Sequence, residues 1–225
     1  MIKVTHTEVF GWETAIRGMR NALESWDKSD SGYVDAGNGR DSVFCIGEED
    51  FGLMKKLVAA GPDHAKFMRM INVTVDITAP LYWWKEFDTY KVGTVANSCS
   101  TMHKIHAKEF TLDDFSCEDL LIKPVEVEGF CDHASPIDAL ALVIGIMNYY
   151  RDKYNATKDK RYWKQMIQLL PTSYNQKRTV QLNYQVLRNM YHARRFHKLD
   201  EWCNFCEFFI ERLPYAELIT MLGRG

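Results

Sequence analysis

The sequence has no long apolar stretch, no export signal and no regular set of cysteines. Its first residues, MIKVTHTEVF, lack the apolar core of a secretion signal. Its longest apolar run, Ala139–Met147, is much shorter than the roughly 20 residues that span a bilayer. The six cysteines are scattered, which favours free thiols over a disulfide framework. These absences predict a cytoplasmic protein that neither crosses nor binds a membrane.

Several common nucleotide-binding and hydrolytic motifs are also missing. There is no GxGxxG after a strand, no phosphate-loop Lys-Ser/Thr signature and no GxSxG elbow. Charge of one sign does not dominate, because 28 Lys and Arg stand against 30 Asp and Glu. A net charge of −2 argues against a nucleic-acid partner. With 225 residues, 46% of them hydrophobic, the chain is long enough for one core, and we predict a single domain over 1–225.

The cysteines offer two weak chemical signals. Cys203 and Cys206 form a CxxC pair, but a structural zinc needs further ligands. The nearby candidates have no regular spacing, and thiols at i and i+3 on a helix are common in cores, so we predict no metal site. Cys99 lies in a polar loop beside Ser100 and is a possible nucleophile. Without an activating base, an ordinary buried thiol is the favoured interpretation.

The N-terminal half alternates between strand and helix signals. We predict a strand over Met1–Phe10, a helix over Gly11–Trp26, a short strand over Val43–Ile46, a helix over Glu48–Ala60 and a half-buried strand from His64 to Ile77. Gly61 should stop the second helix. The Gly/Asp/Ser stretch Lys28–Ser42 is either a substrate lid or a simple exposed loop.

The C-terminal half is helix-rich. Pro80 marks the start of a helix over Leu81–Lys91, and Val92–Ser100 reads as a loop. Further helices are predicted over Ile137–Tyr154, Lys158–Leu169 and Glu201–Leu222, the last interrupted near Pro214. Pro124–Phe130 is a strand or a loop. Because Ala139–Met147 is apolar on nearly all sides, we expect the first of these three helices to be the central buried one.

The stretch from Leu170 to Trp202 reads as a loop feeding one long helix. In such a helix Asn183, Leu187, Met190 and Arg194 share one face, about 16 Å from end to end at 1.5 Å per residue. A face that is polar at both ends and apolar between them suits a flat ligand. Lys177 and Arg178 fall near the helix start, where they bind an anion or extend into solvent.

This stretch resembles the C-terminal signature of flavin-dependent thymidylate synthases. That signature has a Leu-Pro, then an Asn, a Leu, a second Asn and an Arg, and the same residues stand here at the same offsets without a gap. They are Leu170, Pro171, Asn183, Leu187, Asn189 and Arg194. The family's His-Ala-Gln-Trp-Glu continuation is matched only loosely by residues 198–202.

A second block, Asn72–His103, is similar to the family's strand and helix that end in an Arg-His-Arg motif. Here Thr89-Tyr90-Lys91 stands at those three positions, so only the last charge is kept. The family's helix Gln becomes Glu86, which can only accept hydrogen bonds when ionised. The family's later Ser, Asn, Ser and Arg fall, with one inserted residue, on Thr94, Asn97, Ser100 and either Met102 or His103.

The resemblance implies an α+β fold with a mixed or antiparallel sheet packed by helices. It implies an enzyme that binds FAD and methylates a pyrimidine deoxynucleotide, dUMP to dTMP, with NADPH and methylenetetrahydrofolate as co-substrates. It also implies a homotetramer. Carried over residue by residue, the implied cofactor-binding residues are Asn183, Asn189, Lys91, Thr94 and Asn97, and the implied substrate-binding residues are Arg194, Ser100, Glu86 and His103. Arg194 is also the implied catalytic residue.

Two alternatives remain open at this point. The altered motif Thr89-Tyr90-Lys91 favours a non-catalytic relative that binds a flavin or a nucleotide. Glu86 in place of Gln favours a relative with an altered substrate, such as a pyrimidine nucleotide hydroxymethylase.

Overall fold

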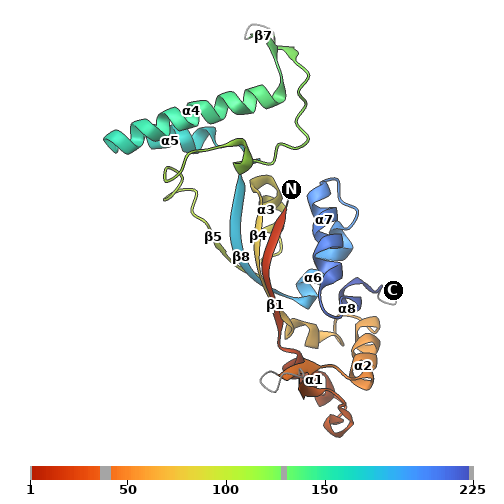
Figure 1. The fold of residues 1–225 in the computed structure, drawn as a ribbon. Helices are drawn as coiled ribbons and strands as arrows, with labels where there is room; N and C mark the ends of the chain where they lie inside the picture. Colours follow the sequence, from red (N-terminus) through yellow and green to blue (C-terminus); the bar gives the residue numbers. More distant parts are fainter. Residues whose placement is uncertain (1, 36–41, 128–130, 223–225) are drawn as a thin grey trace. The chain divides into compact units, whose positions relative to one another are not determined.

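The computed structural model describes residues 2–35, 42–127 and 131–222 (Figure 1). Its internal contacts divide the chain into two compact units. Unit 1 comprises residues 1–3, 77–88 and 97–178, and unit 2 comprises residues 4–76, 89–96 and 179–225. Each unit is described by itself below. The expectation of a single domain stays a prediction.

A four-stranded sheet has the order β1-β4-β8-β5. Its strands are β1 (Lys3–Phe10), β4 (Asn72–Pro80), β8 (Asn175–Asn183) and β5 (Val95–Ser98). Each of the four passes from one unit into the other. In β4 the residues alternate between buried and half-buried, with Val73, Val75 and Ile77 at 0–1% exposure. The predicted half-buried strand is therefore confirmed from Asn72 onward, but its predicted start at His64 is wrong, because Lys66–Arg69 form a 3-10 helix. The mixture of sheet and helices confirms the α+β class.

The N-terminal part of unit 2 follows the predicted order. It contains α1 (Trp12–Asn21), η1 (Trp26–Lys28), the antiparallel hairpin β2 (Gly32–Asp35) and β3 (Ser42–Cys45), α2 (Glu48–Ala59) and η2 (Lys66–Arg69). The first helix ends five residues earlier than predicted. Gly61 follows α2 with φ +109°, as a helix stop should. The predicted loop Lys28–Ser42 contains β2, and its residues 36–41 lie outside the described part of the chain.

The prediction of one long helix fed by a loop is wrong. Residues Asn175–Asn183 form the nine-residue strand β8, in which Gln176, Val180 and Leu182 are buried at even spacing. The helix α6 begins at Tyr184 and ends at Arg194. Period-two burial along β8 therefore replaces the predicted loop and helix start, and the helix begins only after Asn183.

Three short helices close unit 2. They are α7 (Asp200–Phe208), η4 (Ile210–Arg212) and α8 (Glu217–Thr220). The predicted interruption near Pro214 is confirmed. Arg188 on α6 donates from Nη1 to the carbonyl oxygens of Leu218, Ile219 and Met221 at 2.6–3.2 Å. Those carbonyls end α8, so a side chain of α6 replaces the hydrogen bonds that the end of this short helix lacks.

Unit 1 is built on two helices that lie side by side, α4 (Pro136–Thr157) and α5 (Lys160–Leu169) (Figure 1). Ser135 and Asp138 form the predicted capping box at the start of α4. The other elements of this unit are α3 (Leu81–Phe87), η3 (Leu112–Asp114), β6 (Val125–Val127) and β7 (Cys131–Ala134). Pro80, expected as the first helical residue, is the N-cap of α3.

The expectation that α4 is the central buried helix is wrong for the single chain. Leu140, Ile144 and Met147 are buried at helical spacing, with Met166 of α5, in the core of unit 1. Leu142 and Tyr149, by contrast, are 58% and 57% exposed. The single chain therefore covers one side of this apolar helix and leaves another open. No helix within residues 2–35, 42–127 and 131–222 has the length and apolarity to cross a membrane.

Candidate functional site

Arg194, the last residue of α6, lies against two aromatic rings of unit 2. Its Cζ atom is 5.7 Å from the ring centre of Tyr90 and 5.2 Å from that of Trp202. Its Nε donates to Tyr90 Oη at 3.0 Å. Trp202 is fully buried, whereas Tyr90 and Arg194 are half-buried. The half-buried guanidinium is thus held by two aromatic rings and one hydrogen bond.

His197 completes this cluster from the turn that follows α6. Its Nε2 lies 2.9 Å from Arg194 Nη1. Its ring stands edge-on to Trp202, with centroids 6.5 Å apart. Sequence reasoning identified Arg194 but missed Tyr90, Trp202 and His197 as its neighbours. A histidine three residues beyond an arginine at a helix end was the available signal for His197, whereas Tyr90 is more than a hundred residues away in the chain.

Asn183 stands at the other end of α6 and caps it. Its Oδ1 accepts a hydrogen bond from the backbone N–H of Val186 at 3.0 Å. Gly93 lies directly against this cap. A Cβ built on Gly93 would be 2.9 Å from Asn183 Nδ2 and 3.2 Å from Val186 Cγ2, and the residue has φ +81°. Both the space and the backbone conformation therefore require glycine here.

The remaining predicted residues of unit 2 differ in their surroundings. Thr94, next to Gly93, buries its hydroxyl without a hydrogen-bond partner among the described residues. Lys91 is exposed. Asn189 is exposed, and its Oδ1 accepts from Gln185 Nε2 at 3.0 Å. Thr94 and Asn183 therefore present polar groups near the start of α6, while Asn189 lies on its outer surface.

The predicted continuous ligand face from Asn183 to Arg194 is wrong in its middle. Leu187 and Met190 are both 0% exposed. They belong to the core of unit 2, because a helix packed on a core buries the apolar residues of its inner stripe. Only the two polar ends of that face stay half-buried.

Four predicted residues fall in unit 1. Glu86 is half-buried on α3, and Asn97 is exposed in β5. Ser100 and His103 are also exposed, and the Ser100 hydroxyl accepts a hydrogen bond from the backbone N–H of His103 at 2.9 Å. The last two residues thus belong to one turn, with the imidazole of His103 facing solvent.

Arg178 was expected at a helix start, and that position is wrong, because it lies on β8. Its guanidinium stacks 4.2 Å above Trp84 and donates to Asp88 Oδ1 at 2.7 Å and to Gln176 Oε1 at 2.9 Å. This arginine therefore has both a counter-ion and a stacking partner within unit 1. Its neighbour Lys177 is exposed on the same strand.

The cysteines differ in burial, and one of them differs from its prediction. Cys99 was interpreted as buried and is exposed. Burial raises the pKa of the Cys206 thiol to about 12, so this group stays protonated and is a poor metal ligand. Cys203 donates from Sγ to the carbonyl oxygen of His197 at 3.4 Å. Among the described residues there is no group of three or more His, Cys, Asp and Glu able to hold a metal ion.

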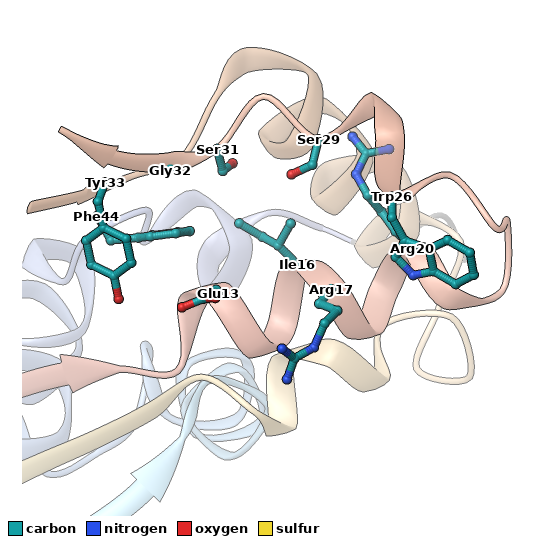
Figure 2. Close-up of a pocket in the computed structure, with 10 residues that line it drawn as sticks. All are labelled: Glu13, Ile16, Arg17, Arg20, Trp26, Ser29, Ser31, Gly32, Tyr33 and Phe44. Carbon is teal, nitrogen blue, oxygen red and sulfur yellow. The ribbon is translucent and has the colours of Figure 1, made fainter.

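Unit 2 also contains an open cavity of about 260 Å³, beside α1 (Figure 2). Arg20, one of the residues that line it, belongs to a buried ion pair, in which its Nε donates to Asp50 Oδ1 at 2.6 Å. Burial alone would raise the pKa of Asp50, but the hydroxyls of Ser29 and Ser31 and the Arg20 guanidinium together hold it below the usual value. The full lining is Glu13, Ile16, Arg17, Arg20, Trp26, Ser29, Ser31, Gly32, Tyr33 and Phe44. It shares no residue with the Arg194 cluster.

Solved structures resemble the whole chain. The flavin-dependent thymidylate synthase ThyX from Helicobacter pylori, complexed with FAD and dUMP, matches over 97% of both chains with a TM-score of 0.65 and 14% identity. The chain has the fold of flavin-dependent thymidylate synthases. The UMP/dUMP methylase PolB from Streptomyces cacaoi, bound with 5-Br dUMP, matches over 98% of this chain and 93% of its own, with a TM-score of 0.57 and 15% identity. No protein-family model and no curated protein matches the sequence.

The residues that carry the sequence resemblance can now be placed in the thymidylate synthase fold. Asn183 and Arg194 are separated by the length of one helix, and the Tyr90–Thr94 segment contacts both of its ends. That segment includes two positions of the altered motif, Tyr90 and Lys91. The two sequence blocks that carry the resemblance therefore meet within unit 2.

Proposed function

We propose that this protein is an FAD-dependent enzyme that methylates a uracil nucleotide, dUMP to dTMP, in the manner of a thymidylate synthase. The observation that carries the proposal is the pair of polar sites at the two ends of α6. One contains Asn183 and Thr94, and the other contains Arg194 with Tyr90 and His197. Both resembled structures were solved with a deoxyuridine monophosphate or its bromo derivative.

The residues at the start of α6 fit a flavin cofactor. Within the described residues the Asn183 amide nitrogen and the buried Thr94 hydroxyl make no hydrogen bond, and Gly93 brings the two segments together. Unused donors beside the N-terminus of a helix suit a carbonyl or phosphate oxygen. Asn183 and Thr94 would therefore hold FAD here, with Asn189, Lys91 and Asn97 as further proposed contacts.

Arg194 would bind the pyrimidine nucleotide. Its guanidinium is planar, always charged and already oriented by Tyr90 and Trp202. A donor fixed in this way stabilises negative charge that develops on a pyrimidine carbonyl during the reaction. Ser100, Glu86 and His103 are the other proposed substrate contacts. They lie in unit 1, and each is half-buried or exposed there.

The bound FAD would supply the electron-transfer chemistry, with NADPH as electron donor and methylenetetrahydrofolate as carbon donor. The chain itself would contribute binding and orientation. We also propose that the enzyme is a homotetramer in the cytoplasm. The apolar side of α4 that the single chain leaves exposed, including Leu142 and Tyr149, provides a surface for contacts between copies.

One preparation tests the proposal. The purified protein should show the visible absorbance of bound flavin. With methylenetetrahydrofolate and NADPH it should release tritium from ring-labelled dUMP and form dTMP. A protein that takes up no flavin and forms no dTMP would contradict the proposal.

A non-catalytic binding protein is the second candidate, favoured by the contact between Tyr90 and Arg194. Tyr90 stands where the resembled motif has a histidine, and its hydroxyl occupies one donor of the arginine. That candidate predicts tight binding of flavin or dUMP without tritium release. A nucleotide hydroxymethylase, suggested by Glu86, instead predicts tritium release with a hydroxymethylated product, which mass spectrometry distinguishes from dTMP.

A further inference from the structure

The imidazole ring of His197 lies between two hydrogen-bond donors. Arg194 Nη1 is 2.9 Å from its Nε2, and the backbone nitrogen of Leu199 is 3.2 Å from its Nδ1. A guanidinium and a backbone N–H can only donate, and a neutral imidazole has one accepting nitrogen and one donating nitrogen. The ring can therefore satisfy only one of these two neighbours at a time.

No protonation state of His197 removes the conflict. With the proton on Nδ1, the ring accepts from Arg194 but points an N–H at the N–H of Leu199. With the proton on Nε2, it accepts from Leu199 but points an N–H at the guanidinium. The doubly protonated ring points a donor at both. Because a charged donor forms the stronger bond, the Nδ1-protonated form is favoured when the nucleotide is absent.

The surroundings of His197 hold its backbone in place and confine its ring. Its backbone N–H donates to the carbonyl oxygen of Arg194 at 3.0 Å. Its own carbonyl oxygen accepts from the Cys203 thiol at 3.4 Å. Its ring is half-buried, edge-on to Trp202. The chain thus fixes an imidazole next to Arg194 in a position where one of its two hydrogen bonds is always lost.

We propose that His197 is a second nucleotide-binding residue, and that it changes tautomer when an acceptor oxygen of the uracil nucleotide reaches Arg194. The guanidinium then donates to that oxygen instead of to His197. The ring protonates at Nε2, accepts from Leu199 at Nδ1, and donates from Nε2 to the same nucleotide. Binding therefore replaces one conflicting contact with two satisfied ones, and the nucleotide gains a donor beside Arg194.

This inference rests on the proposed function, and it adds His197 to the residues that bind the substrate. It also assigns a role to the backbone N–H of Leu199. By occupying Nδ1, that N–H favours the tautomer that donates to the nucleotide. The contribution of Leu199 is therefore indirect, because it acts only through the imidazole of His197.

The first test reads the tautomer directly. Long-range proton–nitrogen NMR on protein with isotope-labelled histidine distinguishes the two neutral forms, and the His197→Gln variant identifies the signal. We expect the Nδ1-protonated form without ligand and the Nε2-protonated form at saturating dUMP. Deoxyuridine, which lacks the phosphate, separates the two sources of oxygen. A switch with both ligands assigns the oxygen to the nucleoside, and a switch with dUMP alone assigns it to the phosphate.

The second test is a pair of variants at Leu199. Leu199→Pro removes the backbone N–H at a residue with φ −86°, close to the range that proline adopts, and Leu199→Ala keeps the N–H. We expect Leu199→Pro to weaken dUMP binding about threefold to tenfold and Leu199→Ala to leave it unchanged, since one neutral hydrogen bond is at stake. In a His197→Ala background the proline effect should vanish.

The outcomes separate this inference from the proposed function. His197→Ala should weaken dUMP binding about tenfold, and His197→Gln, whose amide both donates and accepts, about threefold or less. Wild-type protein that binds dUMP with no tautomer change and no effect of His197→Ala would overturn the inference and leave the proposed function standing. Wild-type protein that binds no dUMP would overturn both.

Discussion

The guanidinium of Arg194 and the phenol of Tyr90 are joined by a 3.0 Å hydrogen bond, although the two residues are 104 positions apart in the sequence. This contact ties the end of α6 to the segment that carries the altered motif. Arginine cannot lose its proton in a protein, so Tyr90 Oη accepts. The tyrosine thereby orients the one cation on which the proposed nucleotide site depends.

Replacing Arg194 should weaken nucleotide binding without unfolding the protein. We expect Arg194→Ala to weaken dUMP binding by about tenfold to a hundredfold, since hydrogen bonds to a charged group contribute about 1.5–3 kcal/mol. Arg194→Lys keeps the charge but loses the planar donor geometry. Its dUMP affinity should lie between those of the wild type and of Arg194→Ala. Titration calorimetry measures the affinity, and circular dichroism checks the fold. Unchanged affinity in Arg194→Ala would count directly against the site.

Tyr90→Phe tests the orientation of Arg194. The variant keeps the ring against which the guanidinium lies and removes only the acceptor. We expect dUMP affinity to fall by about threefold to tenfold, the effect of one hydrogen bond. Tyr33→Phe, a tyrosine at the separate cavity beside α1, is the matched control and should bind dUMP normally. Tighter binding in Tyr90→Phe would show instead that the tyrosine competes with the nucleotide.

Gly93 and Gly61 form a matched pair for testing the flavin site. Both have positive φ, at +81° and +109°, but an added Cβ meets Asn183 and Val186 at Gly93 and nothing within 4 Å at Gly61. We expect both alanine variants to lose about 1 kcal/mol of stability from backbone strain. Only Gly93→Ala should also lose bound FAD, because it displaces Asn183. Flavin absorbance after gel filtration measures the difference, and equal flavin content would contradict the placement.

The buried pair Arg20–Asp50 should dominate the stability of the N-terminal part of unit 2. Asp50→Asn leaves the Arg20 charge buried without a counter-ion, which costs about 3–5 kcal/mol of unfolding free energy. Asp152→Asn removes an exposed pairing partner of Arg151 and should change stability by less than about 1 kcal/mol. Denaturant unfolding measures both. A loss in Asp50→Asn as small as that in Asp152→Asn would show that the pair is not stabilising.

The same carboxylate predicts a dependence on pH. The pKa of Asp50 is lower in the folded protein than its ordinary value, so the unfolded chain binds its proton first as the pH falls. Its contribution is therefore fully present above the ordinary carboxyl pKa, about 3.9. It is lost as the pH falls through the lower folded value. Denaturant midpoints measured across this acid range should fall less steeply in Asp50→Asn than in the wild type.

The exposed apolar side of α4 predicts assembly. Leu142→Asp should shift the protein to smaller species, measured by light scattering after gel filtration, while helix content stays unchanged. Lys164→Asp, a charge change at an exposed position of α5, is the control for added negative charge. A wild-type monomer, or a Leu142→Asp variant of unchanged size, would refute the proposed role of this helix in a tetramer.

Local patterns in the sequence determined much of the secondary structure. The alternation along β4, the capping box of Ser135 and Asp138 and the glycine that ends α2 all depend on residues a few positions apart. Alternating burial, helix caps and positive φ values depend on neighbouring residues, so the sequence alone is sufficient to predict them. The family resemblance that indicated the fold could also be found in the sequence alone, because it depends on fixed residue spacings within two short blocks.

Only the tertiary structure decided what surrounds each of these residues. Helical spacing predicted one ligand-facing surface from Asn183 to Arg194, but Leu187 and Met190 are buried in the core. The strand β8 stands where a loop was expected. The apolar α4 is half-covered, because burial depends on what packs against a helix and not on its composition alone. Tyr90 and Trp202 reach Arg194 through packing between elements that are distant in sequence, which no local pattern encodes.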